Sequence, residues 1–443
     1  MPSQRLSRRS RLDVSWRPDP QPRSRKPTIV TTLPPRRHAA ALRLLLSLAV
    51  ALLLMGAIER RAAAFPWMIR HDYKGCNTCH ADPSGGGILT AYGRGMEETL
   101  LRMYYGKHTG EEDPGKIGNF MFGAFNLPDW LLLQADGRGL FYTDTSAKLT
   151  GTNPFDSTSN PTFYLMQAEA SAQVTLKRFR MYGDLGLGAP GGALASSLTT
   201  GDYRLITRQF WAGLDLGSDN QFLLRLGRIN VPYGLRIIEH TAYVRSATRT
   251  DINASQEYGV TLAYTGEKLR GEVMAIAGNY QIKPDAFRER GGAAYLEWSP
   301  LERFSVGASG LITHADNDIN LATPLWRHAY GAFARWAPVK PVAILAESDL
   351  LFFSQLLPTG ASSNNTGNAS FLQVDLEPVQ GLHFMPTFEL RYNQAIQQGV
   401  AVGGWANVAW FFAPHFDARV DAIFQSQNSK FSTLLLAQLH FVL

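Results

Sequence analysis

Residues 257–264 read Glu-Tyr-Gly-Val-Thr-Leu-Ala-Tyr and alternate between two kinds of side chain. Tyr, Val, Leu and Tyr fall on one face, and Glu, Gly, Thr and Ala fall on the other. Because side chains of a β-strand point alternately to opposite sides, the pattern predicts a strand with one apolar face. The same alternation recurs in residues 269–277, 371–377 and 418–425, where Arg, Glu, Asp and Gln share a face. Such strands fit either a half-buried soluble sheet or a membrane barrel.

The spacing of turns distinguishes these two settings. Seven tight polar turns recur 34 to 49 residues apart, near residues 177–178, 217–219, 266–268, 300–302, 338–340, 378–380 and 413–415. Loops rich in Gly, Ser, Asn and Thr lie between them, at residues 151–161, 189–201, 237–256, 283–289, 313–326 and 357–368. Short turns at one end and long loops at the other are typical of outer-membrane barrels. Two tandem soluble β-sandwiches are the alternative, but they do not need this asymmetry.

Seven short turns between Pro128 and Leu443 predict 16 strands. The fold class is therefore all-β: a transmembrane antiparallel outer-membrane β-barrel of about 16 strands, preceded by a small helical segment. The last residues put Leu435, Leu439 and Phe441 on one apolar face, which is similar to a barrel insertion signal although the chain ends in Leu rather than an aromatic residue. The predicted barrel domain covers residues 121–443.

The N-terminus predicts export. Residues 1–40 are rich in Arg and Pro, and the apolar run Leu44 to Ile58 is shorter than the roughly 20 residues of a membrane-spanning helix. Basic residues precede this run and Ala62-Ala63-Ala64 follows it, so residues 1–64 are interpreted as a signal peptide with a long disordered head. The chain carries a net charge of +6 and residues 1–64 carry +10, so the remainder carries −4. This remainder gives no reason to expect nucleic-acid binding, and the predicted location is the outer membrane of a Gram-negative bacterium.

The chain has only two cysteines, and they stand in Cys76-Asn77-Thr78-Cys79-His80. In an exported chain, C-x-x-C can be a disulfide, a redox pair, half of a zinc site or a haem attachment site. A zinc site needs a second ligand pair, and a thioredoxin-like pair needs an α/β unit; neither surrounds this motif. The adjacent histidine favours one covalent haem c, with thioether links to Cys76 and Cys79 and with His80 as the proximal iron ligand.

The flanks of the motif suggest a small haem-binding segment, residues 65–120. Pro83 to Gly87 is a flexible reversal, and Thr90 to Tyr105 has helical spacing with Met96, Leu100 and Met103 on one face. Met103 and Met96 are the first candidates for the sixth iron ligand, followed by His108, with His71 and Met121 also nearby. Arg94 is a candidate partner for a haem propionate. This segment is too short to bury much surface alone, so it is expected to plug the barrel lumen or dock at its mouth.

The motif and the following Leu89-Thr90-Ala91-Tyr92-Gly93-Arg94 resemble the fused outer-membrane monohaem cytochrome–porins, including the iron-oxidising type. The resemblance implies electron transfer across the outer membrane by a single haem, with a periplasmic c-type cytochrome and an extracellular donor or acceptor such as Fe(II) as partners. The Ser-Gly-Gly-Gly insert and Lys74-Gly75 depart from that family. Two alternatives stay open: a solute porin with an accessory haem, and a barrel scaffold for a separate multihaem cytochrome.

Residues 227–236, Gly-Arg-Ile-Asn-Val-Pro-Tyr-Gly-Leu-Arg, are similar to a segment of trimeric-porin-like barrels. The resemblance implies that the following loop folds into the pore, that Arg228, Arg236, Glu239 and Arg245 line a constriction, and that the protein can form a homotrimer. Ordinary charge at the loop rim is the alternative for these four residues.

Overall fold

The computed structural model describes residues 65–105, 120–148, 161–188, 204–253, 255–319, 321–357, 359–394, 398–428 and 430–443. The predicted signal peptide (residues 1–64) and His108 lie outside these residues, as do most of the predicted loops 151–161 and 189–201. No helix among the described residues is long and apolar enough to cross a membrane.

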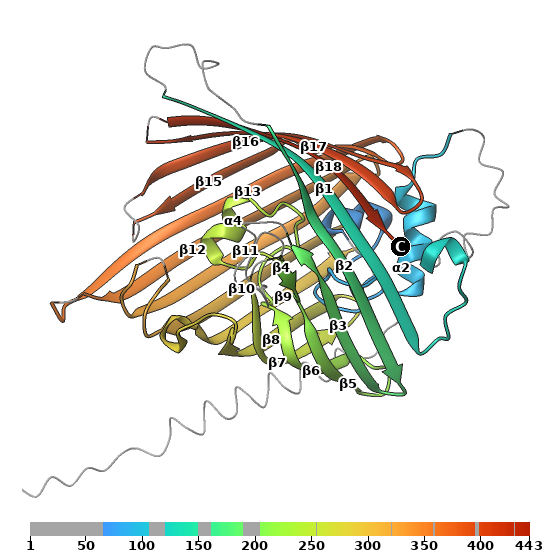
Figure 1. Cartoon of the computed structure of the whole chain (residues 1–443), viewed down its shortest axis with the longest axis horizontal. Helices are drawn as coiled ribbons and strands as arrows, with labels where there is room; N and C mark the ends of the chain where they lie inside the picture. Colours follow the sequence, from blue (N-terminus) through green and yellow to red (C-terminus); the bar gives the residue numbers. More distant parts are fainter. Residues whose placement is uncertain are drawn as a thin grey trace, which may run out of the picture. The chain divides into compact units, whose positions relative to one another are not determined.

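A single antiparallel sheet forms most of the described chain (Figure 1). Its segments are β1 (Leu131–Lys148), β2 (Thr162–Leu176), β3 (Phe179–Gly188), β4 (Arg204–Ile206), β5 (Phe210–Leu216), β6 (Phe222–Asn230), β7 (Gln256–Thr265), β8 (Leu269–Gly278), β9 (Arg290–Leu301), β10 (Phe304–Ala315), β11 (Leu325–Val339), β12 (Val342–Leu356), β13 (Ser362–Val379), β14 (Leu382–Phe384), β15 (Thr387–Asn393), β16 (Gln398–Ala413), β17 (Phe416–Gln427) and β18 (Lys430–Val442).

The sheet closes on itself as a barrel of 16 strands. Both β4 and β5 pair with β3, and both β14 and β15 pair with β13 and β16, so each of these two pairs is one interrupted strand. The 18 segments of the described chain therefore make 16 strands, as the turn count predicted. Closure comes from β1, which pairs with β18 from Asp136↔Val442 to Lys148↔Lys430.

All seven predicted short turns join neighbouring strands at one end of the barrel. The predicted bounds of two loops, residues 313–326 and 357–368, are wrong. Strand β10 continues to Ala315 and β11 begins at Leu325, while β13 begins at Ser362. Ser362 to Asn368 are polar and small, and they pair regularly with β12 despite that loop-like composition.

The two faces of the strands differ as the alternation predicted. On β7 the side chains of Val260 and Leu262 are about 40% exposed on the outer face, whereas Thr261 and Ala263 are buried inside. Arg270 and Glu272 of β8 are part of a charged inner face, together with Asp375 and Glu377 of β13. An apolar exterior around a polar lumen is the pattern of a membrane barrel and not of a soluble sandwich.

The N-terminal segment 65–105 is a chain of short helical turns that binds the inner wall of the barrel and, from Thr99 onward, the short turn at residues 378–381. It contains the 3₁₀ helix η1 (Pro66–His71), the α-helix α2 (Ala91–Met96) and the π-helical turn η2 (Glu97–Leu101); η3 (Phe120–Gly123) precedes β1. The helix expected from Thr90 to Tyr105 is therefore shorter. Regular helix ends at Met96, and the chain is extended at Arg102.

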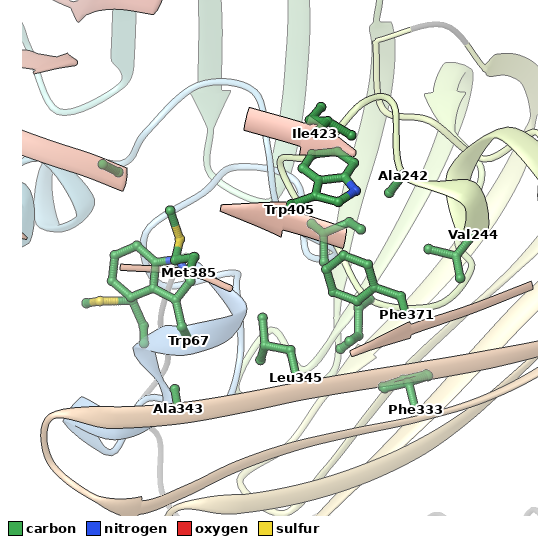
Figure 2. Packing of buried hydrophobic residues seen from close by; sticks show 14 of the residues in the cluster. Trp67, Ala242, Val244, Phe333, Ala343, Leu345, Phe371, Met385, Trp405 and Ile423 are labelled. Atoms are coloured by element: carbon green, nitrogen blue, oxygen red, sulfur yellow. The ribbon is translucent and has the colours of Figure 1, made fainter. Parts of the chain in front are cut away.

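Two buried apolar clusters join this segment to the barrel wall. Trp67, Met68 and Leu101 pack with Ala242 and Val244 of an infolded loop and with wall residues; Figure 2 labels Trp67, Ala242, Val244, Phe333, Ala343, Leu345, Phe371, Met385, Trp405 and Ile423. Ala81 and Ile88 belong to a second cluster with Tyr182 and Trp211. Contact with the wall thus supplies the apolar surface that so short a segment cannot provide for itself.

Candidate functional site

The C-x-x-C-H motif forms one tight turn. The backbone N–H of His80 donates to the carbonyl of Cys76 at 2.9 Å, and that of Cys79 donates to the same oxygen at 3.3 Å. Both cysteines are free thiols, and Cys79 is only 1% exposed. This turn places the two sulfurs and the imidazole close together in sequence and in space, which is the arrangement required for a haem c linked through two thioethers.

The glycine-rich segment passes directly over the motif. Gly85 has φ +96°, a left-handed conformation that favours glycine. A Cβ at Gly85 would lie 3.2 Å from the sulfur of Cys76, so the missing side chain leaves room beside this thiol. The flexible reversal predicted at residues 83–87 is thus a close cover for the motif.

The imidazole of His80 has the surroundings of a metal ligand. Its Nδ1 lies 3.3 Å from the carbonyl oxygen of Gly87. A proton on Nδ1 donates to this carbonyl, which leaves Nε2 as the basic nitrogen; ligating histidines commonly use this second hydrogen bond. Burial lowers the pKa of His80, although the Gly87 carbonyl opposes the shift, so the neutral, ligating form is favoured. The imidazole of His80 and the thiols of Cys76 and Cys79 are therefore the chemical groups that a haem c requires.

Helix α2 covers the other side of the motif. Thr90 caps this helix by accepting a hydrogen bond from the N–H of Gly93 at 3.0 Å, and its own N–H donates to the carbonyl of Cys79 at 2.9 Å. Gly93 packs so tightly on the Cys79 backbone that a Cβ there would overlap it. The segment Leu89 to Arg94, which carried the family resemblance, therefore holds the C-x-x-C-H motif in place.

Charged side chains of the barrel wall meet the motif. Arg270 of β8 donates to the sulfur of Cys76 at 3.0 Å, and Arg225 of β6 lies 3.1 Å from the carboxylate of Asp82. Burial, with the neighbouring Cys76, raises the pKa of Cys79 to about 12. Redox-active cysteines have lowered pKa values, so this environment does not suit a thioredoxin-type pair.

The candidates for the sixth iron ligand are spread over the segment. The sulfur of Met96 accepts a hydrogen bond from the Tyr73 hydroxyl at 2.9 Å, and the N–H of Met103 donates to Phe411 of β16 at 2.8 Å. His71 lies 3.5 Å from the carboxylate of Glu377, and Met121 is on the exposed turn η3. Met96 and Met103 do not share one helical face, because the helix ends between them. In the described part of the chain, no three His, Cys, Asp or Glu side chains gather in a way that could hold a metal ion.

Arg94 is buried between α2 and the wall. Its guanidinium donates to the carbonyl of Leu133 on β1 and lies 6.0 Å from the ring centre of Phe120. Its Nε has no hydrogen-bond partner among the described residues. Burial lowers the pKa of Arg94 to about 10, so the side chain remains a cation at neutral pH.

The sequence did not indicate how the segment is held in the lumen. Arg70 is completely buried and lies 2.6 Å from Asp375 and 3.2 Å from Glu377, both on β13. At the short-turn end, Asp72 pairs with Arg303 at 2.7 Å. These contacts join residues that are 231 or more positions apart in the sequence, so no local sequence motif could predict them.

The loop 231–255 folds into the lumen, as the porin resemblance implied, and carries the helix α4 (Tyr243–Thr248). Its charged residues bind the wall and the plug. Arg245 pairs with Glu347 of β12, Glu239 lies 2.9 Å from Arg419 of β17, and Arg236 donates to Ser84 at 3.0 Å. Arg228, at the end of β6, donates to the carbonyl of Thr207. These interactions anchor the loop, and Arg228, Glu239 and Arg245 are buried by them.

Solved structures of outer-membrane barrels resemble this chain. The loop-deleted OmpT of Vibrio cholerae has a TM-score of 0.52 and 10% identity, covering 71% of this chain and 100% of that chain. The outer membrane channel DcaP of Acinetobacter baumannii has a TM-score of 0.51 and 10% identity, and the match covers 71% of this chain and 97% of DcaP. In vitro-folded OmpT of Vibrio cholerae, in its trimer form, has a TM-score of 0.52 and 10% identity, and the match covers 71% of this chain and 100% of that OmpT chain. No family model and no curated protein sequence matches the chain. At this identity the likeness shows the fold, which is that of the outer-membrane porins.

Proposed function

We propose that this protein is an outer-membrane electron-transfer barrel of a Gram-negative bacterium, with one haem c bound covalently to Cys76 and Cys79 inside the lumen. The observation that supports this proposal best is the buried C-x-x-C-H turn, whose histidine directs Nδ1 to the Gly87 carbonyl. A haem c held there would accept and release one electron at a time. His80 would bind the iron through Nε2, and Arg94 is the proposed cation for a propionate.

The position of the motif suggests which partners meet at each end. Arg270, which contacts Cys76, is the second residue of β8 and therefore lies near the short-turn end. Short turns face the periplasm in outer-membrane barrels. A periplasmic c-type cytochrome would approach from this end, while a small extracellular donor or acceptor, such as Fe(II), would enter from the long-loop end.

A pyridine haemochrome spectrum of purified outer membranes tests the proposal. The intact protein is expected to give a c-type spectrum, and Cys79→Ala is expected to lose the double thioether signature while its barrel still folds. The absence of any c-type signal from the intact protein would eliminate the electron-transfer function.

A solute porin is the second candidate function. The similarity to solved porins and channels supports a porin more directly than it supports haem electron transfer. One of these structures is described as an anion-selective porin, from Comamonas acidovorans, with a TM-score of 0.50. Ion conductance of the intact protein in planar bilayers separates the candidates, since a fixed plug predicts a small conductance and an open porin a large one. The trimer form of OmpT supports the proposal of a homotrimer here. The scaffold for a multihaem cytochrome is less favoured, because residues 65–105 already lie within the lumen.

A further inference from the structure

A cavity of about 520 Å³ lies inside the barrel beside the infolded loop. It is lined by residues of this loop around α4 and by residues of β15, β17 and β18, and none of its lining residues belongs to the plug 65–105. The haem motif contacts a different part of the wall, namely β6 and β8. The cavity is therefore a separate site, and its volume is within the usual range for small-molecule pockets.

The charge of the lining is positive. Arg391 of β15 and Lys430 of β18 both line the cavity, and none of the described residues that line it is a carboxylate. The nearest inward carboxylate on the same strand, Glu389, is fully buried. Its oxygens accept hydrogen bonds from the N–H of Tyr243 at 2.8 Å and from the indole of Trp405 at 2.9 Å. Glu389 also lies within electrostatic range of Arg391, so Arg391 and Lys430 together exceed it by one positive charge.

An aromatic ring packs against the guanidinium of Arg391. The guanidinium carbon of Arg391 lies 4.6 Å from the ring centre of Tyr243, which belongs to α4. Stacking of this kind orients the planar guanidinium, which can then bind a carboxylate through two parallel hydrogen bonds. Tyr243 and Leu434 add apolar surface to the same cavity, and Gln425 adds a carboxamide.

We propose that this cavity binds a small organic carboxylate, with Arg391 and Lys430 at the anionic group and with Tyr243 and Leu434 at the carbon body. A bare inorganic anion would use the cations but not the apolar surface. A neutral compound of the same shape would use the apolar surface but not the cations. The site is independent of the haem, since no residue of the motif lines it.

Calorimetric titration of the purified full-length protein in detergent, with benzoate as the probe, tests this proposal. Benzoate is expected to bind at least about tenfold more tightly than benzamide or inorganic phosphate. Arg391→Gln and Lys430→Gln are each expected to lower the affinity for benzoate by about tenfold or more. Arg178→Gln, which removes the same charge in the exposed turn between β2 and β3, is the matched control and should bind as the wild type does.

Equal binding of benzoate and benzamide would overturn the proposal, as would wild-type benzoate affinity in a folded Arg391→Gln variant. Phosphate binding as tight as benzoate binding would reduce the cavity to a simple anion site and would also overturn it. The β-sheet circular dichroism of each variant verifies folding. Repeating the titration with Cys76→Ala separates this result from the haem proposal, because loss of haem is expected to leave benzoate binding unchanged.

Discussion

Arg70 in the N-terminal segment forms a completely buried ion pair with Asp375 on β13, with 2.6 Å between Nη2 of the arginine and the carboxylate oxygen. Glu377, also on β13, accepts from the same guanidinium at 3.2 Å, and its other oxygen accepts the N–H of Gly381 at 3.1 Å. Arg70 therefore supplies one positive charge to two buried carboxylates, and His383 contacts both of them as well. This relationship makes the N-terminal segment part of the electrostatic balance of the barrel wall.

Replacing Arg70 is expected to release the plug. Arg70→Met removes the buried arginine from Asp375 and Glu377, although His383 stays beside both. Breaking a buried ion pair in this way costs about 3–5 kcal/mol. Arg303→Gln is the matched control: the Arg303–Asp72 pair also joins the plug to the wall, but its side chains are 33% and 45% exposed, and such pairs contribute about 1 kcal/mol or less. Limited proteolysis should cleave residues 65–105 much faster in Arg70→Met than in Arg303→Gln. Equal cleavage rates would contradict this role of Arg70.

Deleting residues 65–105 is expected to raise the single-channel conductance in planar bilayers. The segment fills part of the lumen through Trp67, Met68 and Ala81, and ions can use this volume once it is absent. The intact protein measured at the same ionic strength is the reference. No increase in a correctly folded deletion variant would show that the remaining loop 231–255 alone closes the pore.

Two glycines of α2 provide a test of the packing on the C-x-x-C-H motif. Gly93→Ala is expected to destabilise the segment, because the new Cβ overlaps the backbone of Cys79. Gly95→Ala places its Cβ in open space and removes a helix-interior glycine, a change that stabilises by roughly 0.5–1 kcal/mol. Hydrogen exchange of residues 76–96 measures both effects. Similar protection in the two variants would mean that α2 does not hold the motif.

The stability of the long-loop end is expected to depend on pH through Glu289. Burial alone would raise the pKa of this carboxyl, but Arg327 and Arg249 hold the pKa of Glu289 well below its usual range. Because the folded pKa is depressed, the stabilisation is complete above the unfolded pKa of about 4.3 and is lost as the pH falls below it. Glu289→Gln should therefore cost about 2 kcal/mol at pH 7 and progressively less in acid.

Denaturant unfolding of wild type and Glu289→Gln at several pH values measures this difference. In an Arg249→Gln background the same comparison should give a smaller pH dependence, because one of the two partners is gone. A difference that stays constant from pH 7 to pH 3 would argue against the ion pairs as its source.

The barrel could be predicted from the sequence because its signals are local. The alternation in residues 257–264 predicts which side chains lie on the outer face of the barrel, and the seven short turns predict where one strand ends and the next begins. Gly, Ser and Asn composition was a poorer guide at residues 362–368, where pairing with β12 overrides it.

The cysteine motif was visible for the same local reason, but its surroundings were not. The ion pairs of Arg70 and Asp72, and the contact of Arg270 with Cys76, join positions that are far apart in the chain. The helical stripe of Met96 and Met103 was a wrong prediction, because the chain leaves the helix to pair Met103 with β16. Such changes depend on tertiary contacts that override local periodicity.

The pairing of β1 with β18 closes the sheet around the N-terminal segment. The plug precedes β1, which forms one side of this seam, and β18 forms the other side. Within the closed barrel the thiols of Cys76 and Cys79 are buried, with 4% and 1% of each residue exposed. A reagent that alkylates thiols should therefore react with these cysteines much faster in the unfolded chain than in the folded barrel.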